Sequence, residues 1–110
     1  MERRRDPRFE MSQMVELGFG RERFVHADGI NISRSGIRCR TQEELDIGTT
    51  VTLDFAVDAD TDLTETLSMD AIVKRCDPLE EESFDVGMEY VALSKTAERA
   101  LNAYLAELEG

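Results

Sequence analysis

The feature that most constrains the fold of this chain is an alternation of apolar and polar residues with a period of two. It is clearest where Val51, Leu53, Phe55 and Val57 are separated by polar or small residues. Because successive side chains of a β-strand point to opposite faces, this pattern predicts a half-buried strand. From such patterns, and from the turn residues between them, six strands are predicted, over residues 11–19, 24–33, 36–41, 51–57, 67–76 and 84–90.

A single helix is predicted after the last strand. Ser94 is placed to accept hydrogen bonds from the amides of a first helical turn. The apolar residues that follow fall on one helical face: Ala97, Ala100, Leu101, Tyr104, Leu105 and Leu108. Strands followed by one helix argue against alternating strand–helix units. The predicted fold class is therefore all-β, a six-stranded antiparallel barrel with a C-terminal α-helix packed on it.

The 110 residues suit one domain, which divides into three segments. Residues 1–10 have no apolar periodicity, and Pro7 lacks an amide donor and favours an extended residue before it. Ordering such a segment costs about 1–2 kcal/mol per residue in backbone entropy, with little burial to offset it. We therefore predict a flexible N-terminal tail over 1–10, a barrel over 11–93 and the packed helix over 94–110.

Charge is distributed unevenly along the chain, whose net charge is −11. Residues 1–40 contain 9 Lys and Arg against 6 Asp and Glu, a net charge of +3. Residues 41–110 contain 4 against 18, a net charge of −14. An acidic body disfavours binding to a nucleic acid polymer or to anionic lipid. A small anionic ligand at the basic N-terminal third fits this asymmetry better.

Other residue types limit the possible functions. Cys39 and Cys76 are isolated and the chain has one His, so we expect no metal site, and cysteines that act as small apolar side chains rather than a disulfide. The sequence shows no nucleophile–base constellation and no glycine-rich phosphate loop, so an enzyme is not expected. No apolar run approaches a membrane span, and the chain opens with charges rather than a signal peptide, so we expect a cytoplasmic protein without membrane insertion.

A polar motif at residues 31–36 is predicted to join the second and third strands. Alternation points Asn31 and Ser33 to the face opposite Ile32, and Gly36 is free to take a positive φ in the turn. The outer face would then carry a carboxamide, a hydroxyl and nearby guanidinium groups, which suit a planar, polar, anionic ligand. Asn, Ser and Gly also dominate ordinary turns, so this motif alone does not establish a site.

Arginines gather upstream of this motif. Arg4 and Arg8 are four residues apart, so an extended tail presents both on one side. A guanidinium group is a planar fork that matches phosphate or the O6/N7 edge of guanine. Taken alone, however, the charged block over residues 3–8 is typical of a solubilising tail.

The two motifs, in this order on an all-strand body with a terminal helix, resemble the PilZ domain family. Its members are bacterial six-stranded barrels that bind cyclic di-GMP, a second messenger. The family pattern is R-x-x-x-R followed downstream by Asp/Asn-x-Ser-x-x-Gly. Arg4 and Arg8 match the first part, and Asn31, Ser33 and Gly36 match the second. The resemblance covers nearly the whole chain and implies a PilZ-type barrel that takes cyclic di-GMP as ligand and no other cofactor.

The resemblance also implies roles for individual residues. Arg4 and Arg8 would contact guanine and phosphate, with Arg3 or Arg5 assisting by stacking or charge. Arg34, Arg38 and Arg40 are weaker candidates, because the family pattern does not fix them. The implied ligand-binding residues are Arg3, Arg4, Arg5, Arg8, Asn31, Ser33, Arg34 and Gly36.

The implied mechanism is an ordering switch in signal transduction. The tail would fold across the nucleotide and change a surface that an unidentified effector protein reads. A protein-interaction module that keeps the barrel but binds no nucleotide is the alternative. An oligonucleotide-binding barrel would need exposed aromatic residues and a basic groove, whereas the five Phe and two Tyr fall mostly on predicted core faces. The sequence leaves open a monomer or a weak homodimer, and one bound nucleotide or a stacked pair.

Overall fold

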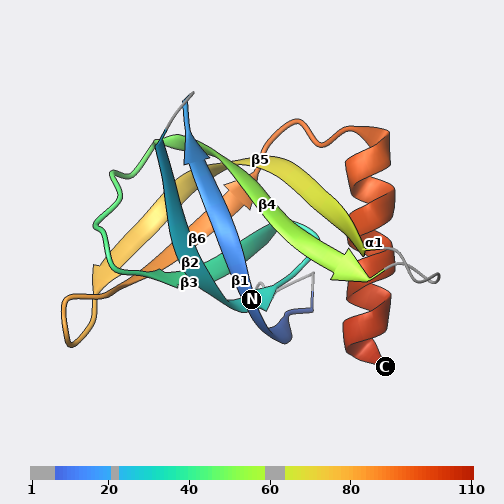
Figure 1. Cartoon of the computed structure of the whole chain (residues 1–110), viewed down its shortest axis with the longest axis horizontal. Coiled ribbons are helices and arrows are strands. Elements are labelled where there is room, and N and C mark those ends of the chain that lie inside the picture. Colours follow the sequence, from blue (N-terminus) through green and yellow to red (C-terminus); the bar gives the residue numbers. More distant parts are fainter. Residues whose placement is uncertain (1–6, 21–22, 59–63) are drawn as a thin grey trace, which may run out of the picture.

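The computed structural model describes residues 7–20, 23–58 and 64–110, in which six strands precede one helix (Figure 1). The strands are β1 (Phe9–Phe19), β2 (Arg23–Ile32), β3 (Gly36–Thr41), β4 (Thr50–Asp58), β5 (Thr64–Pro78) and β6 (Phe84–Tyr90), and the helix is α1 (Lys95–Glu109). The predicted strands over 36–41 and 84–90 have the observed bounds, and the others differ at their ends. β1 begins at Phe9, inside the segment predicted as tail, because Phe9 pairs with Ile32 of β2.

The six strands close into an antiparallel barrel. Their order around it is β1-β2-β3-β6-β5-β4, and β4 pairs with β1 to complete the ring. That last pairing is short and joins residues 16–18 to residues 52–54. The predicted fold class is therefore confirmed: a mainly β chain forming a six-stranded antiparallel barrel followed by one helix.

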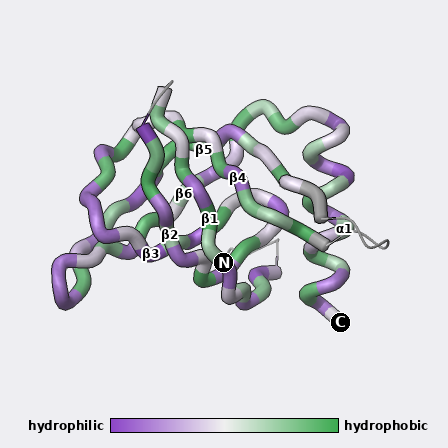
Figure 2. Tube along the Cα trace, viewed as in Figure 1, coloured by the Kyte–Doolittle hydropathy of each residue, from purple (hydrophilic) through white to green (hydrophobic). Residues whose placement is uncertain are grey.

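The core fills the barrel, and the alternation of the sequence places it there. Hydropathy alternates along the strands in Figure 2, and the four apolar residues of β4 that define the pattern are all buried. Fully burying a Val, Leu or Phe side chain stabilises the fold by about 1.5–3 kcal/mol relative to leaving it exposed. Cys39 also lies in the core as a free thiol, and burial raises its pKa to about 12, which keeps it protonated and unreactive. Cys76 is also a free thiol in the structure.

The C-terminal helix packs against the barrel through its predicted face. Ser94 is the N-cap, and its Oγ accepts a hydrogen bond from the amide of Ala97 at 3.0 Å, as predicted. Leu101 and Tyr104 are buried, and the Tyr104 ring meets Phe55 of β4 edge-on with 5.4 Å between ring centroids. The helix contacts β1 and β5. Within the described residues, no helix combines the length and the apolar character needed to cross a bilayer.

A β-bulge in β2 sets the orientation of the polar motif. Gly29 faces Cys39 of β3 but Asn31 faces Arg38, so Ile30 is an extra residue with no opposite partner in β3. A bulge of one residue shifts the alternation beyond it. In the first part of β2 every second residue is buried, up to Gly29. Without the bulge, this alternation would place Asn31 in the core. The bulge instead buries Ile32 and places Asn31 on the outer face.

Candidate functional site

The turn between β2 and β3 is held by hydrogen bonds that converge on Ser33 and Gly36. The amide of Ser33 donates to the carbonyl of Gly36 at 2.9 Å, and Ser33 Oγ accepts from the amides of Ser35 and Gly36 at 3.2 and 3.3 Å. The hydroxyl of Tyr90, at the end of β6, donates to the carbonyls of Ser33 and Gly36, each 3.1 Å away. Burial raises the pKa of Tyr90, so this phenol keeps the proton that it donates.

This turn corrects two expectations. Ser33 was expected on the outer face with Asn31, but only 1% of its surface is exposed, because its hydroxyl caps the turn from inside. Gly36 was expected to have a positive φ, but it is not among the residues with positive φ. Gly36 is needed for another reason: a Cβ at this position would lie well inside van der Waals distance of the Met88 carbonyl oxygen. The proposed contacts of both residues with a ligand stay predictions.

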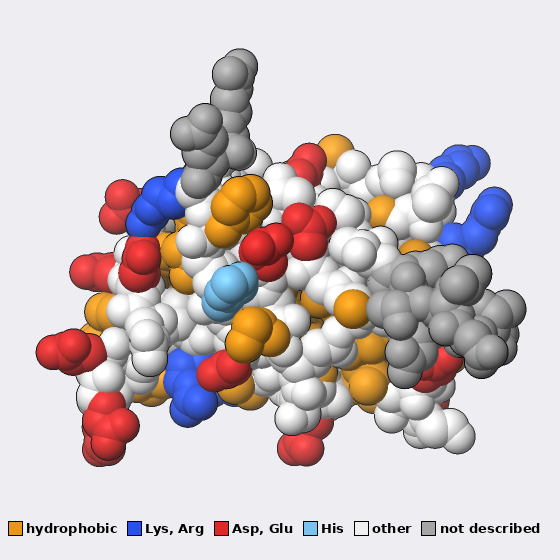
Figure 3. Space-filling model, viewed as in Figure 1, with side chains coloured by type: hydrophobic (Ala, Val, Ile, Leu, Met, Phe, Trp, Pro, Cys, Tyr) orange, Lys and Arg blue, Asp and Glu red, His pale blue; other side chains and the backbone are white. Residues whose placement is uncertain are grey.

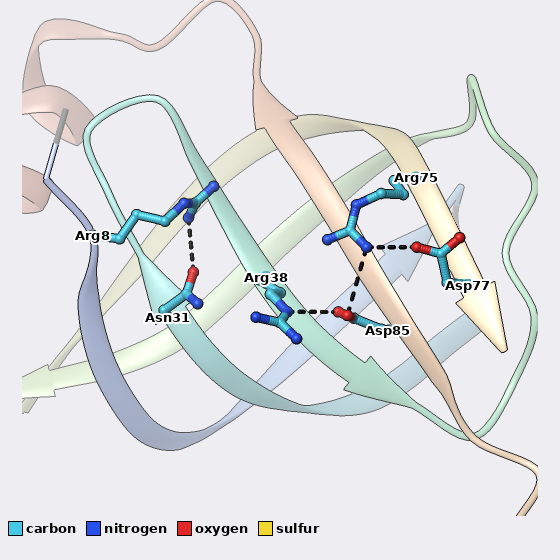
Figure 4. A network of polar contacts seen from close by, with 6 residues as sticks. All are labelled: Arg8, Asn31, Arg38, Arg75, Asp77 and Asp85. Carbon is cyan, nitrogen blue, oxygen red and sulfur yellow. Dashed lines mark hydrogen bonds and ion pairs between the residues drawn. The ribbon is translucent and has the colours of Figure 1, made fainter. Parts of the chain in front are cut away.

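The two predicted motifs meet at one hydrogen bond. Arg8, which directly precedes β1, donates from Nη1 to Asn31 Oδ1 at 2.8 Å (Figure 4). Antiparallel pairing of β1 with β2 produces this contact, because Glu10 lies opposite Asn31. The structure thus joins residues 23 positions apart in the sequence. Arg34 is exposed on the turn.

Arg3, Arg4 and Arg5 lie outside the described residues. Their proposed contacts with a nucleotide stay predictions.

Two further arginines lie on the outer face beside this contact. Arg38 of β3 and Arg75 of β5 both pair with Gly87 of β6, one on each side. A bulge at Lys74, between the pairs Val73–Met88 and Arg75–Gly87, turns Arg75 outward. Its guanidinium group lies over Gly87, where an added Cβ would come within 3.3 Å of Arg75 Nη2. Because Gly87 has no side chain, the flat guanidinium group of Arg75 fits there on the barrel surface.

Asp85 links the two arginines. Arg38 Nε donates to Asp85 Oδ1 at 2.8 Å, and Arg75 Nη1 lies 3.5 Å from Asp85 Oδ2 (Figure 4). Arg75 Nη1 also donates to Asp77 Oδ2 at 2.6 Å. The hydrogen bond from Arg38 holds the pKa of Asp85 below its usual value, although partial burial acts in the opposite direction. The carboxylate is therefore ionised at neutral pH.

This ion pair predicts a pH dependence of stability. Because the pKa of Asp85 is lower in the folded than in the unfolded state, its contribution is fully present above about pH 5 and is lost as the pH falls through the folded pKa. Between pH 6 and pH 3, the wild type should lose more free energy of unfolding than Asp85→Asn, as measured by urea titration at each pH. Equal losses in the two proteins would contradict the role of this ion pair.

An open hollow of about 250 Å³ adjoins these groups, lined by residues that include Arg8, Ser35, Gly36, Lys74, Arg75 and Gly87. Glu89 also lines it, with Oε1 3.6 Å from Lys74 Nζ. Guanidinium and ammonium donors around such a hollow suit a phosphate or a base edge. Acidic side chains are spread over the face of the molecule drawn in Figure 3, whereas three cationic side chains and one carboxylate line this hollow. The local charge therefore supports an anionic ligand at this hollow.

A larger hollow of about 340 Å³ lies on the outer face of β1 to β3 and is lined by none of the residues that the family motifs fix. Met14, His26, Asp28 and Arg40 are among its lining residues, and Arg40 pairs there with Asp28 at 3.3 Å. Arg40, a weaker candidate from the sequence, thus pairs away from the Arg8–Asn31 contact, whereas Arg38 lies beside it.

Three residues on the outer face beside the Arg8–Asn31 contact were missed by sequence reasoning: Arg75, Asp85 and Gly87. The alternation of the strand over 84–90 held a signal for two of them, because Asp85 and Gly87 occupy its outward positions. The direction of Arg75 depends on the bulge at Lys74, which no residue pattern announces. Only the observed pairing of β5 with β6 shows that Arg75 lies beside the site.

Comparison with solved structures supports the fold. The PilZ domain of YcgR from Escherichia coli, solved with c-di-GMP, matches with a TM-score of 0.76 and 14% identity over 98% of this chain and 92% of that one. The Bacillus subtilis inhibitor of motility MotI/DgrA matches with a TM-score of 0.75 and 20% identity over 97% of this chain and 51% of that one. MrkH of K. pneumonia, in complex with c-di-GMP, matches with a TM-score of 0.73 and 20% identity over 99% and 52%.

This chain spans about half the length of MotI/DgrA and MrkH. At these identities the likenesses show the shared fold. Comparison with curated protein sequences gave no match. The sequence pattern of the PilZ domain family, however, matches residues 2–107. These residues include the arginine motif, the Asn-x-Ser-x-x-Gly motif, the whole barrel and most of the helix. The chain belongs to the PilZ domain family.

Proposed function

We propose that this chain is a cyclic di-GMP receptor and acts as an adaptor for an effector protein. The observation that carries the proposal is the hydrogen bond between Arg8 and Asn31, which joins the two halves of the family motif next to the arginines on β3 and β5. Two of the structures that share the fold, those of YcgR and MrkH, contain c-di-GMP. Both observations favour a nucleotide site at this face of the barrel.

The chemistry of the site suits this ligand. Cyclic di-GMP carries two phosphodiester anions and two guanine bases. The guanidinium group of Arg8 can bind a phosphate or the O6/N7 edge of guanine with two parallel hydrogen bonds, and the carboxamide of Asn31 can bind a base edge. These groups bind and orient a ligand, which fits a receptor rather than an enzyme.

The proposed response is closure of the N-terminal segment over the nucleotide. Arg8 lies at the end of this segment where it joins β1, and in the free protein its Nη1 donates to Asn31. Ligand binding would redirect donors of Arg8 and of the arginines before it toward phosphate and guanine. An effector protein would then recognise the changed surface. A PilZ barrel that binds proteins but no nucleotide is the alternative.

The test is calorimetric titration of the protein with cyclic di-GMP, with GTP as the control ligand. Arg8→Ala should weaken binding by about 1–3 kcal/mol, roughly 5- to 150-fold, because a bidentate arginine contact is lost. Arg40→Ala is the matched control, since it removes an exposed arginine from the other hollow and should leave affinity unchanged. Wild-type affinity in Arg8→Ala would contradict the proposed site. Absence of heat with the wild type would favour the protein-interaction module.

A further inference from the structure

We propose that Asp85 is a positioning residue of the nucleotide site, which fixes the guanidinium groups of Arg38 and Arg75 on either side of Gly87 before the ligand arrives. The inference rests on the proposed function, because the ligand is the same nucleotide. It adds a carboxylate to a site that is otherwise built to attract anions. The role of that carboxylate is to orient the cations next to it.

The register of the strands brings the three groups together. Arg38 and Arg75 flank Gly87 on the two neighbouring strands, and Asp85 lies two residues earlier on the same outer face of β6. From this position its two carboxylate oxygens contact different arginines, Oδ1 contacting Arg38 and Oδ2 contacting Arg75 (Figure 4). Because Gly87 has no side chain, the guanidinium group of Arg75 can lie over the backbone of β6 between the two strands. One carboxylate thus contacts an arginine on each of the two strands that neighbour β6.

The atoms used in these contacts leave the arginines able to bind a ligand. Asp85 accepts the Nε–H of Arg38, and no other hydrogen bond of Arg38 is found with the described residues. The two terminal NH₂ groups of Arg38 therefore remain as a fork for another acceptor. Arg75 uses Nη1 for both carboxylates, while its Nη2 lies above Gly87. Asp85 thus orients Arg38 through a hydrogen bond and Arg75 through a longer ion pair, and leaves terminal NH₂ donors on both arginines.

The burial of Asp85 distinguishes an anchor from a surface charge. Its side chain is 13% exposed, whereas the side chain of Asp77 is 56% exposed. A shielded carboxylate holds its hydrogen bonds against competition from water and salt better than an exposed one. Arginine side chains have many rotamers, so fixing them in the free protein lowers the entropy lost when a ligand binds. Asp85 should therefore strengthen binding despite its negative charge.

The competing account gives the opposite sign. If Asp85 acted only as a negative charge near an anionic ligand, its removal would tighten binding. Asp77 offers the comparison, because it also pairs with Arg75 but its hydrogen bond is to that arginine alone among the described residues. Asp77→Ala should change binding less, since it removes a like charge together with one hydrogen bond of Arg75 and leaves Arg38 anchored. Asp85→Ala should weaken it.

The experiment is calorimetric titration of four variants with cyclic di-GMP at two salt concentrations. We expect binding to weaken about tenfold in Asp85→Ala and less in Asp85→Asn, whose amide oxygen still accepts from Arg38 Nε. Asp28→Ala is the matched control, because it breaks an exposed Asp–Arg pair between neighbouring strands outside the site and should bind like the wild type. Tightening in both Asp85→Ala and Asp77→Ala, or unchanged binding in Asp85→Ala, would overturn the proposal.

A second measurement needs no nucleotide. In ¹⁵N spectra, the Nε–H of Arg38 should exchange slowly with water in the wild type and in Asp77→Ala, but rapidly in Asp85→Ala. Thermal unfolding of each variant establishes that the barrel remains folded during this comparison. If the wild type binds no cyclic di-GMP, the proposed function fails, while the exchange rates still decide whether Asp85 orders Arg38. Rapid exchange in the wild type would overturn the positioning role.

Discussion

Replacing Gly36 with alanine is expected to lower the free energy of unfolding by about 3 kcal/mol, the upper part of the range for overpacking. The new Cβ would overlap the carbonyl oxygen of Met88, which is backbone and cannot rotate away. Relief requires separation of β3 from β6 at their first pair, Gly36 with Glu89. That movement also strains the hydrogen bond of 3.0 Å from the Tyr90 amide to the Ser35 carbonyl. Urea unfolding followed by circular dichroism measures the loss.

Gly87→Ala is the control for this substitution. It places the same methyl group on the outer face of β6, but the nearest atoms belong to the flexible end of Arg75, 3.3 Å away. The side chain can move, so we expect stability to change by less than about 1 kcal/mol. Equal destabilisation of the two variants would show that the Met88 contact is not what requires glycine at position 36.

Much of the barrel was predictable because alternation and burial express the same geometry. The strand over 84–90 was predicted with its observed bounds, since a run of apolar residues at every second position ends there in polar turns on both sides. β5 is longer than predicted at both ends. Its extra residues carry no apolar alternation and are ordered by their partners, with Thr64 opposite Asp58 and Pro78 opposite Phe84. Strand ends therefore depend on pairing rather than on the strand's own sequence.

The site was predictable in composition but less so in orientation. The motif residues Arg8 and Asn31 do meet, yet their contact depends on the pairing of β1 with β2 and on the bulge at Ile30. Ser33 turns inward because a hydroxyl that accepts two amide hydrogen bonds stabilises the turn. The inclusion of Arg75 results from a second bulge. Bulges are a property of paired strands, so a single-strand pattern does not show them.

Leu101→Ala is expected to lower the free energy of unfolding by about 3 kcal/mol, within the range of about 2–5 kcal/mol for buried leucines. Leu101 is 1% exposed at the interface of α1 with the barrel. The helix has 15 residues and is marginal on its own, so its stability comes from packing rather than from its sequence. The substitution leaves a cavity between α1 and the barrel, which the helix contacts at β1, β4 and β5. Urea unfolding should show one transition at a lower denaturant concentration.

Leu79→Ala is the matched control, because Leu79 is 47% exposed and lies in the turn after β5. Its truncation should cost less than about 0.5 kcal/mol. A small cost for Leu101→Ala as well would mean that the helix unfolds independently of the barrel. The distinction bears on the site, because β1 follows Arg8 and β5 carries Arg75. If α1 and the barrel unfold together, Leu101→Ala also lowers the free energy of unfolding of the two strands that position those arginines.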